Sequence, residues 1–155
     1  MSNSAIGLKE LWPIMKEVID SGGEFTFGPR GISMMPLIRQ GQDKVVLVKA
    51  DSVKKGDAVF YQRDNGQFVL HRIVKVKKNG YVMCGDNQYE LEYGITDKHI
   101  LAKMKAVVRD GVVIDENDKK YKKYVKRLPF RRFKKKIRIF LGKTKARIFN
   151  RKKAV

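Results

Sequence analysis

The sequence is poor in cysteine and lacks long apolar runs. Cys84 is the single cysteine, which excludes a disulfide within the chain and a cysteine-based zinc site, and fits a reducing compartment. No stretch approaches the ~18 consecutive apolar residues of a membrane-spanning helix, and the N-terminus lacks the basic run and apolar segment of a secretory signal. We therefore expect no transmembrane segment and no signal peptide, and a chain that is cytoplasmic or peripheral at a membrane.

Ligands for a metal or a nucleotide are also scarce. His99 has no second histidine or cysteine at metal-ligand spacing, and no glycine-rich loop of the phosphate-binding type is present. The sequence thus predicts no metal and no cofactor, with His99 in a structural role and Cys84 in the core.

Acidic residues are absent from the last part of the chain. Residues 119–155 hold 18 of the 35 Lys and Arg residues and none of the 16 Asp and Glu residues, so the rest of the chain is close to neutral. A basic arm of this kind binds anionic partners such as lipid headgroups, nucleic acid or an acidic protein.

Large apolar side chains recur at helical spacing within this arm, namely Phe130, Phe133, Ile137 and Phe140 or Leu141. A basic amphipathic helix with aromatic residues on its apolar side is typical of binding to a membrane surface, and we expect residues 119–155 to bind an anionic one. Nucleic acid is the less favoured partner, and a tail that is solvated or packed on the body is the third possibility. Pro129 predicts one break in the helix.

The chain divides into three segments that differ in the pattern of their apolar, turn-forming and charged residues: 1–23, 24–116 and 117–155. In the first, apolar residues form one stripe at helical spacing that Gly22-Gly23 ends: Leu8, Leu11, Trp12, Met15, Val18 and Ile19. This pattern predicts an amphipathic helix over residues 5–21 that packs on the core. The alternative is a helix that lies on a membrane, with Trp12 at the level of the headgroups.

The sequence pattern of the middle segment, residues 24–116, is typical of a mainly β domain. Short runs rich in Val, Ile, Tyr and Phe alternate with turn signals, and they are Phe25–Phe27, Lys44–Val48, Ala58–Tyr61, Phe68–Val76, Tyr81–Cys84, His99–Val108 and Val112–Ile114. Asn65-Gly66 and Asn79-Gly80 are typical of tight hairpin turns. The spacing predicts a small antiparallel β-barrel or sandwich.

Three short segments within the β domain carry groups that can do chemistry. They are Gly31-Ile32-Ser33-Met34-Met35-Pro36, Leu70-His71-Arg72-Ile73 and Gly85-Asp86-Asn87. Each segment alone is weak, because a loop serine, a strand histidine and a Gly-Asp-Asn turn are common in proteins of every function. Their order along the chain, with Gly56-Asp57-Ala58-Val59 between the first two, makes them informative.

In this order the segments resemble the type I signal peptidase superfamily, which also contains the self-cleaving repressors. The resemblance covers about residues 24–108 and implies the β-barrel or sandwich of that superfamily, with Ser33 as the nucleophile. Because a histidine followed by arginine stands at the base position, the chain resembles the histidine-type, endoplasmic-reticulum-like branch. It is similar to a soluble bacterial member that lacks the membrane anchor.

The resemblance also implies the other site residues. His71 would be the general base and Asp86, in the matched Gly-Asp-Asn motif, the carboxylate that orients it, with Glu92 as the second choice. A serine hydroxyl needs such a base, and the ordinary pKa of histidine, ~6.5, suits it to accept and return the proton. Gly31 stands where many relatives have a hydroxyl residue, so backbone N–H groups, including that of Ser33, would form the oxyanion hole.

These assignments predict a serine endopeptidase that cleaves an extended leader or signal-like peptide. The substrate would add as a strand to exposed edges at residues 24–30 and 81–85. The side chains expected to bind it are Phe27, Met34, Tyr81 and Met83. Two alternatives remain open: a non-catalytic β-domain that binds nucleic acid or anionic surfaces through its basic tail, and a self-cleaving regulatory protein.

Overall fold

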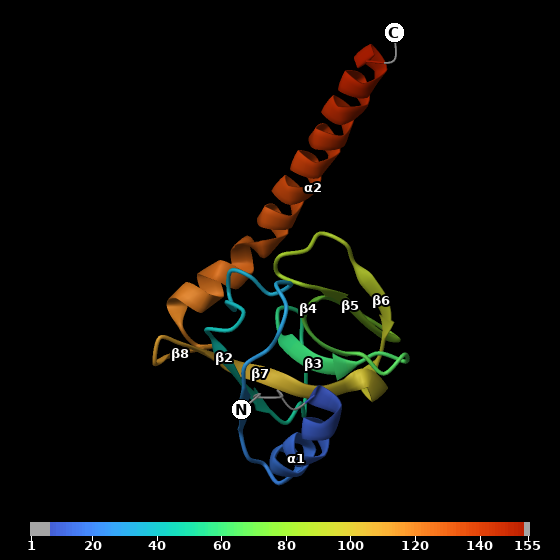
Figure 1. Cartoon of the computed structure of the whole chain (residues 1–155). Helices are drawn as coiled ribbons and strands as arrows, with labels where there is room; N and C mark the ends of the chain where they lie inside the picture. Colours follow the sequence, from blue (N-terminus) through green and yellow to red (C-terminus); the bar gives the residue numbers. More distant parts are fainter. Residues whose placement is uncertain (1–6, 154–155) are drawn as a thin grey trace, which may run out of the picture.

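A computed structural model describes residues 7–153, with side chains as far as residue 142 (Figure 1). The chain forms a β domain with a short helix against it and a long helix that leaves it at the C-terminal end. The elements are α1 (Leu8–Asp20), β1 (Phe25–Phe27), β2 (Lys44–Val48), β3 (Ala58–Gln62), β4 (Phe68–Lys77), β5 (Gly80–Cys84), β6 (Glu92–Ile95), the 3-10 helix η1 (Asp97–His99), β7 (Ile100–Arg109), β8 (Val112–Asp115) and α2 (Lys119–Lys153).

The eight strands form one antiparallel sheet. Its order is β1-β2-β7-β3-β4-β5-β6, and β8 adds to β7. The prediction of a mainly β, antiparallel domain is confirmed. The described strands form an open path from β1 to β6 rather than a closed barrel, because the pairing partner of β1 is β2 and that of β6 is β5.

The two predicted hairpin turns are present. Asn65-Gly66 joins β3 to β4 with Gly66 at φ 83°, and Asn79-Gly80 joins β4 to β5 with Gly80 at φ 133°. A Cβ at residue 80 would lie 2.3 Å from the carbonyl oxygen of Ile95, so Gly80 is required both by its backbone conformation and by the close approach of β6.

One strand, β6, is absent from the sequence prediction. It is four residues long, contains Gly94 at φ 87° and is half exposed, so its own residues carry little strand signal. Its pairing with β5, in which Tyr81 faces Ile95 and Met83 faces Glu92, holds it in place. The strand matters because it carries Glu92.

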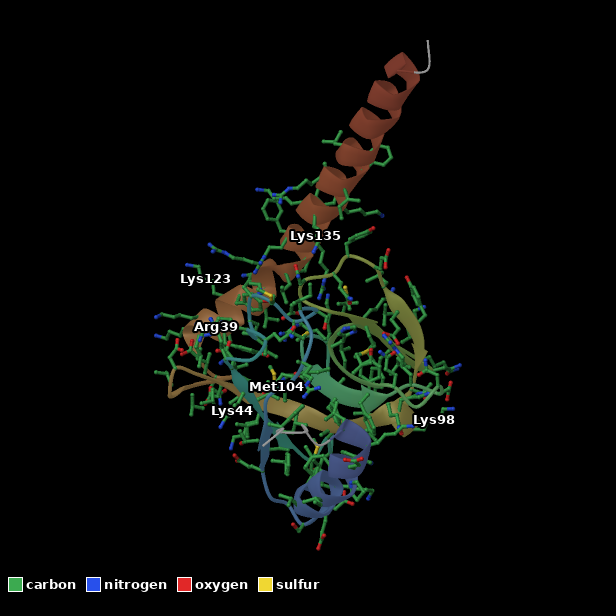
Figure 2. All side chains as sticks on the ribbon, in the orientation of Figure 1. Arg39, Lys44, Lys98, Met104, Lys123 and Lys135 are labelled. Atoms are coloured by element: carbon green, nitrogen blue, oxygen red, sulfur yellow. The ribbon has the colours of Figure 1, made fainter. Side chains whose placement is uncertain are left out.

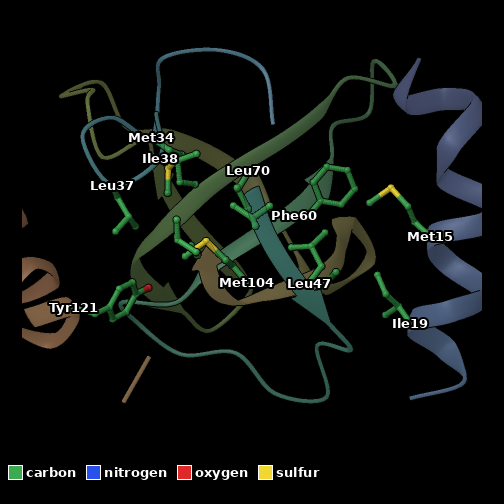
Figure 3. Close-up of a cluster of buried hydrophobic side chains, with 14 residues drawn as sticks. Met15, Ile19, Met34, Leu37, Ile38, Leu47, Phe60, Leu70, Met104 and Tyr121 are labelled. Atoms are coloured by element: carbon green, nitrogen blue, oxygen red, sulfur yellow. The ribbon is translucent and has the colours of Figure 1, made fainter. Parts of the chain in front are cut away.

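The first helix packs on the core, as the favoured interpretation predicted. Met15 and Ile19 are buried against the sheet (Figure 3). Trp12 packs on the rings of Phe60 and Phe68, with centroids 5.8 and 6.0 Å away. Because the apolar stripe of this helix packs on the core, it is not available to lie on a membrane, and the alternative interpretation of α1 is not supported.

The second helix runs through Pro129 without ending, so the predicted break is wrong. Instead α2 changes direction in its first half (Figure 1), as expected where proline removes a backbone hydrogen bond. Its beginning is fixed to the domain by Tyr121 and Leu128, both buried. None of the described helices combines the length and the apolar character that a bilayer-spanning segment requires.

Candidate active site

Ser33 lies in the loop between β1 and β2. Two residues that follow it, Met34 and Ile38, are buried in the main core, and the Ile38 amide donates to the Met34 carbonyl at 3.1 Å. Ser33 itself is half-exposed. Burial of the neighbouring apolar side chains thus holds the loop down while the serine faces the surface.

The far end of this loop is anchored by Asp43. Its buried carboxylate accepts hydrogen bonds from the Arg39 side chain, at 3.0 and 2.7 Å, and from Arg109 Nη2 at 2.9 Å. Burial alone would raise the pKa of Asp43, but the hydrogen bonds from the two arginines hold it well below its usual range. Asp43 is therefore a structural anchor of the loop.

The Gly-Asp-Asn segment holds the Ser33 loop from the other side. The Asn87 amide donates to the Ser33 carbonyl at 2.7 Å, and the Asn87 side chain donates to the Ile32 carbonyl at 3.2 Å. A Cβ at Gly85 would lie 2.7 Å from the Ser33 carbonyl oxygen, so the two loops approach as closely as a glycine allows. This contact explains why the two motifs occur together.

His71 is a buried residue of β4. Its Nδ1 lies 3.3 Å from the hydroxyl of Tyr61 and 3.7 Å from Glu92 Oε2. Tyr61 donates its own hydroxyl proton to Glu92 Oε2 at 2.7 Å, so the oxygen of Tyr61 is left to accept from His71 Nδ1. This network assigns the proton to Nδ1 and leaves Nε2 with a free lone pair, the form that a general base requires.

Burial keeps this imidazole neutral. It lowers the pKa of His71 to about 4, and the negative charge of Glu92 opposes the shift only in part. Arg63 explains why Glu92 raises the pKa of His71 so little. Its Nε and Nη2 donate to the two oxygens of Glu92 at 2.6 and 2.7 Å, so the positive guanidinium offsets the negative charge of the carboxylate. At neutral pH His71 is therefore unprotonated, the form that a general base requires.

Ser33 and His71 line the same cleft, whose volume is about 650 Å³. Of the side chains predicted to bind substrate, Phe27 and Met34 line this cleft too. Met83 lines a neighbouring cavity of about 400 Å³ that also reaches His71 and Glu92.

Tyr81 lies elsewhere, because its hydroxyl donates to Asp97 and its ring packs on a second cluster of buried residues. The expected free strand edge at residues 81–85 is also contradicted, since β5 pairs with β4 on one side and with β6 on the other.

Asp86 is engaged elsewhere. Its buried carboxylate accepts from Arg72 Nε at 2.8 Å, from Arg72 Nη2 at 2.7 Å and from the Tyr124 hydroxyl at 3.1 Å. Arg72 also donates to the Gly56 carbonyl at 2.6 Å and to the Tyr121 hydroxyl at 3.0 Å. The matched motif singles out Asp86, but the geometry favours Glu92, the second choice, as the carboxylate that orients His71.

Sequence reasoning missed Tyr61 and Arg63. One signal could have found Tyr61: the Asn65-Gly66 turn fixes the register of β3 on β4, which pairs Val59 with His71 and puts Tyr61 diagonally across from the histidine on the same face. Arg63 follows β3 in the turn region, and nothing in its sequence context points to Glu92.

The second helix reaches the same region. Lys135 Nζ donates to the backbone carbonyl of Asn87 and to its side-chain oxygen, the latter at 2.9 Å. Figure 2 shows Lys135 where α2 passes beside the β domain. Lys135, Asn87 and the Ser33 carbonyl therefore form one continuous path of hydrogen bonds from α2 to the Ser33 loop.

No protein-family model matches this chain, and the search of curated proteins finds no significant match. The functional interpretation therefore depends on the motifs and on the geometry of the cleft.

Proposed function

We propose that this chain is a serine endopeptidase of the signal peptidase type, which cleaves an extended leader or signal-like peptide. One observation carries the proposal. Ser33 and a neutral, buried His71 line one cleft, and the network of Tyr61 and Glu92 leaves the Nε2 lone pair of His71 available.

The mechanism follows from these positions. Ser33 Oγ attacks the scissile carbonyl while His71 Nε2 takes the hydroxyl proton, and the new C–O bond gives a tetrahedral oxyanion. His71 then gives the proton to the leaving amine as the C–N bond breaks. A water molecule, deprotonated by the same nitrogen, then attacks the acyl carbonyl; the C–O bond to Ser33 breaks, His71 returns the proton to Ser33 Oγ, and the acid product leaves. Backbone N–H groups of the Ser33 loop would stabilise the oxyanion, because Gly31 offers no side chain for this task.

Glu92 has a defined part in this cycle. When His71 becomes an imidazolium, Nδ1 donates to Tyr61, which already donates to Glu92. The carboxylate thereby stabilises the new charge through one intervening hydroxyl. Glu92 and Tyr61 are positioning residues, since they act on the substrate only through His71.

The cleft suits an extended peptide with apolar side chains. Phe27, Met34 and Leu70 contribute apolar surface to it. The three-residue strand β1, at the end of the sheet, pairs with β2, and among residues 7–153 no strand pairs with its other edge, to which a substrate strand could add. Of the two edges expected to receive the substrate, the one at residues 24–30 therefore remains the candidate.

Active-site labelling tests the proposal. A fluorophosphonate should add once to the wild-type chain, at Ser33, and intact-mass measurement should show no adduct on Ser33→Ala or His71→Ala. Ser52→Ala is the matched control, because Ser52 is exposed and lies outside the cleft, and it should label like wild type. An adduct that persists on Ser33→Ala would contradict the assignment of the nucleophile.

A further inference from the structure

The long helix α2 has one face that packs on the β domain. Tyr121 and Leu128 are buried there, and Tyr124 donates to Asp86. Further along, Arg132 Nη2 lies 3.7 Å from Asp86 and Lys135 binds Asn87. These five residues of the helix, at spacings of three or four, define the packed face of α2.

A second set of side chains on α2 is apolar and exposed. Phe130 and Phe133 are 60% and 61% exposed, and the other three members of the set are also exposed: Ile137, Phe140 and Leu141. At about 100° per residue, these five positions fall on the side of the helix opposite Arg132 and Lys135. We call them the exposed apolar stripe. The contacts that fix α2 to the domain come from the packed face, and the stripe lies on the other side of the helix.

The surroundings of the exposed apolar stripe are strongly basic. Lys134 and Arg138 flank it, the Lys134 ammonium lies 4.7 Å above the ring of Phe130, and residues 119–155 contain no acidic residue. Five large apolar side chains in a row between cations are costly to leave in water. This combination fits the boundary between anionic headgroups and acyl chains, where the apolar side chains contact acyl chains and the Lys and Arg contact headgroups.

We infer that α2 docks on an anionic lipid surface, with the exposed apolar stripe inserted at the headgroup boundary and the flanking Lys and Arg on the headgroups. Nucleic acid could pair its phosphates with the Lys and Arg side chains. It would give Ile137 and Leu141 no apolar partner, however, because these two side chains have no ring on which a base could stack. The inference goes beyond the proposed peptidase function and does not depend on it. Docking would hold the Ser33 loop at a fixed distance from the bilayer, since Lys135 connects α2 to Asn87.

Vesicle co-sedimentation of the full chain is the test. Wild type should bind vesicles of phosphatidylcholine and phosphatidylglycerol, and phosphatidylcholine alone only weakly. The triple variant Phe130→Gln, Phe133→Gln, Ile137→Gln keeps the charge and the helix propensity, and should bind the anionic vesicles at least about tenfold more weakly. The matched control, Val112→Gln with Val113→Gln, removes exposed apolar side chains from β8 and should bind like wild type.

Fluorescence supplies a readout that does not depend on the triple variant. In Phe133→Trp, anionic vesicles should shift part of the emission to shorter wavelength, whereas Trp12 of wild type, packed on Phe60 and Phe68, should not respond. The inference would be overturned if the triple variant bound vesicles as tightly as wild type. It would also be overturned if the emission of the Phe133→Trp variant did not shift, or if wild type bound duplex or single-stranded nucleic acid more tightly than the anionic vesicles.

Discussion

At the scale of the residue, the site depends on the protonation state of His71. Its imidazole is buried and contacts Tyr61 through Nδ1, so Nε2 is the nitrogen that could act as the base in the proposed reaction. The sequence alone could nominate Ser33 and His71 as candidate nucleophile and base, because short motifs in a fixed order carry them. It could not supply the tautomer, which depends on a hydroxyl from β3 and a carboxylate from β6.

The pH dependence of activity follows from this burial. Since the pKa of His71 is lowered to about 4, the base stays unprotonated well below neutral pH, and the acidic limb of kcat/KM should have its midpoint near pH 4. In the unfolded chain His71 protonates near its ordinary pKa of ~6.5, whereas in the folded chain it stays neutral down to about pH 4. Its contribution to the free energy of unfolding is therefore fully present above pH ~6.5 and is lost as the pH drops towards 4. A limb that stays near the ordinary histidine pKa of ~6.5 in the rate profile would contradict a buried imidazole as the base.

Replacing Glu92 separates the two candidate carboxylates. In Glu92→Gln the Tyr61 bond survives but the negative charge does not, so kcat should fall about a hundredfold, less than the ~10⁴-fold seen when a carboxylate in direct contact is lost. Thermal stability should change little, because Glu92 is partly exposed. Steady-state kinetics with a cleavable peptide, alongside a melting curve, measures both quantities.

The variant Asp86→Asn should behave in the opposite way. It leaves the buried guanidinium of Arg72 without its carboxylate, which costs about 3–5 kcal/mol of folding stability. We expect a lower melting temperature and, in the fraction that stays folded, a smaller loss of kcat than in Glu92→Gln. A larger loss of kcat with unchanged stability would restore Asp86 as the orienting group.

At the scale of the element, two loops position the proposed nucleophile, Ser33, by mutual contact. The turn signals at Asn65-Gly66 and Asn79-Gly80 predicted the hairpins, since those dipeptides determine their turns locally. The contact between the Gly85 and Ser33 loops was not predictable, because it joins segments far apart in the chain. The strand β6 was not predicted for the same reason, since its pairing with β5, rather than its own composition, makes it a strand.

Gly85→Ala tests this contact. Its Cβ would lie 2.7 Å from the Ser33 carbonyl oxygen, a backbone atom that cannot rotate away, so the Ser33 loop must move. We expect overpacking of about 1–3 kcal/mol and a drop in labelling of Ser33 that exceeds the loss of folded protein. Gly142→Ala, where nothing lies within 4 Å, is the control and should label normally. Normal labelling of Gly85→Ala would show that the loop tolerates displacement.

At the scale of the whole molecule, the charge asymmetry read from the sequence corresponds to the division of the structure into a β domain and a long helix (Figure 1). The sequence predicted a basic amphipathic arm. It did not predict that one face of α2 closes over Asp86 and Asn87 while another stays exposed, because that division depends on which side of the helix meets the domain. The same helix thus contributes to the frame of the candidate active site and carries the exposed apolar stripe that we propose docks on lipid.

The most direct test of the central claim is cleavage of a diverse peptide library by the full chain, read by mass spectrometry, with anionic vesicles present. We predict that wild type and Ser52→Ala cut one recurrent class of extended sites and that Ser33→Ala and His71→Ala cut none of them. Cleavage that survives in Ser33→Ala, or the absence of any cleavage by a wild-type chain that is folded, would contradict the assignment of this cleft as the active site of a serine peptidase.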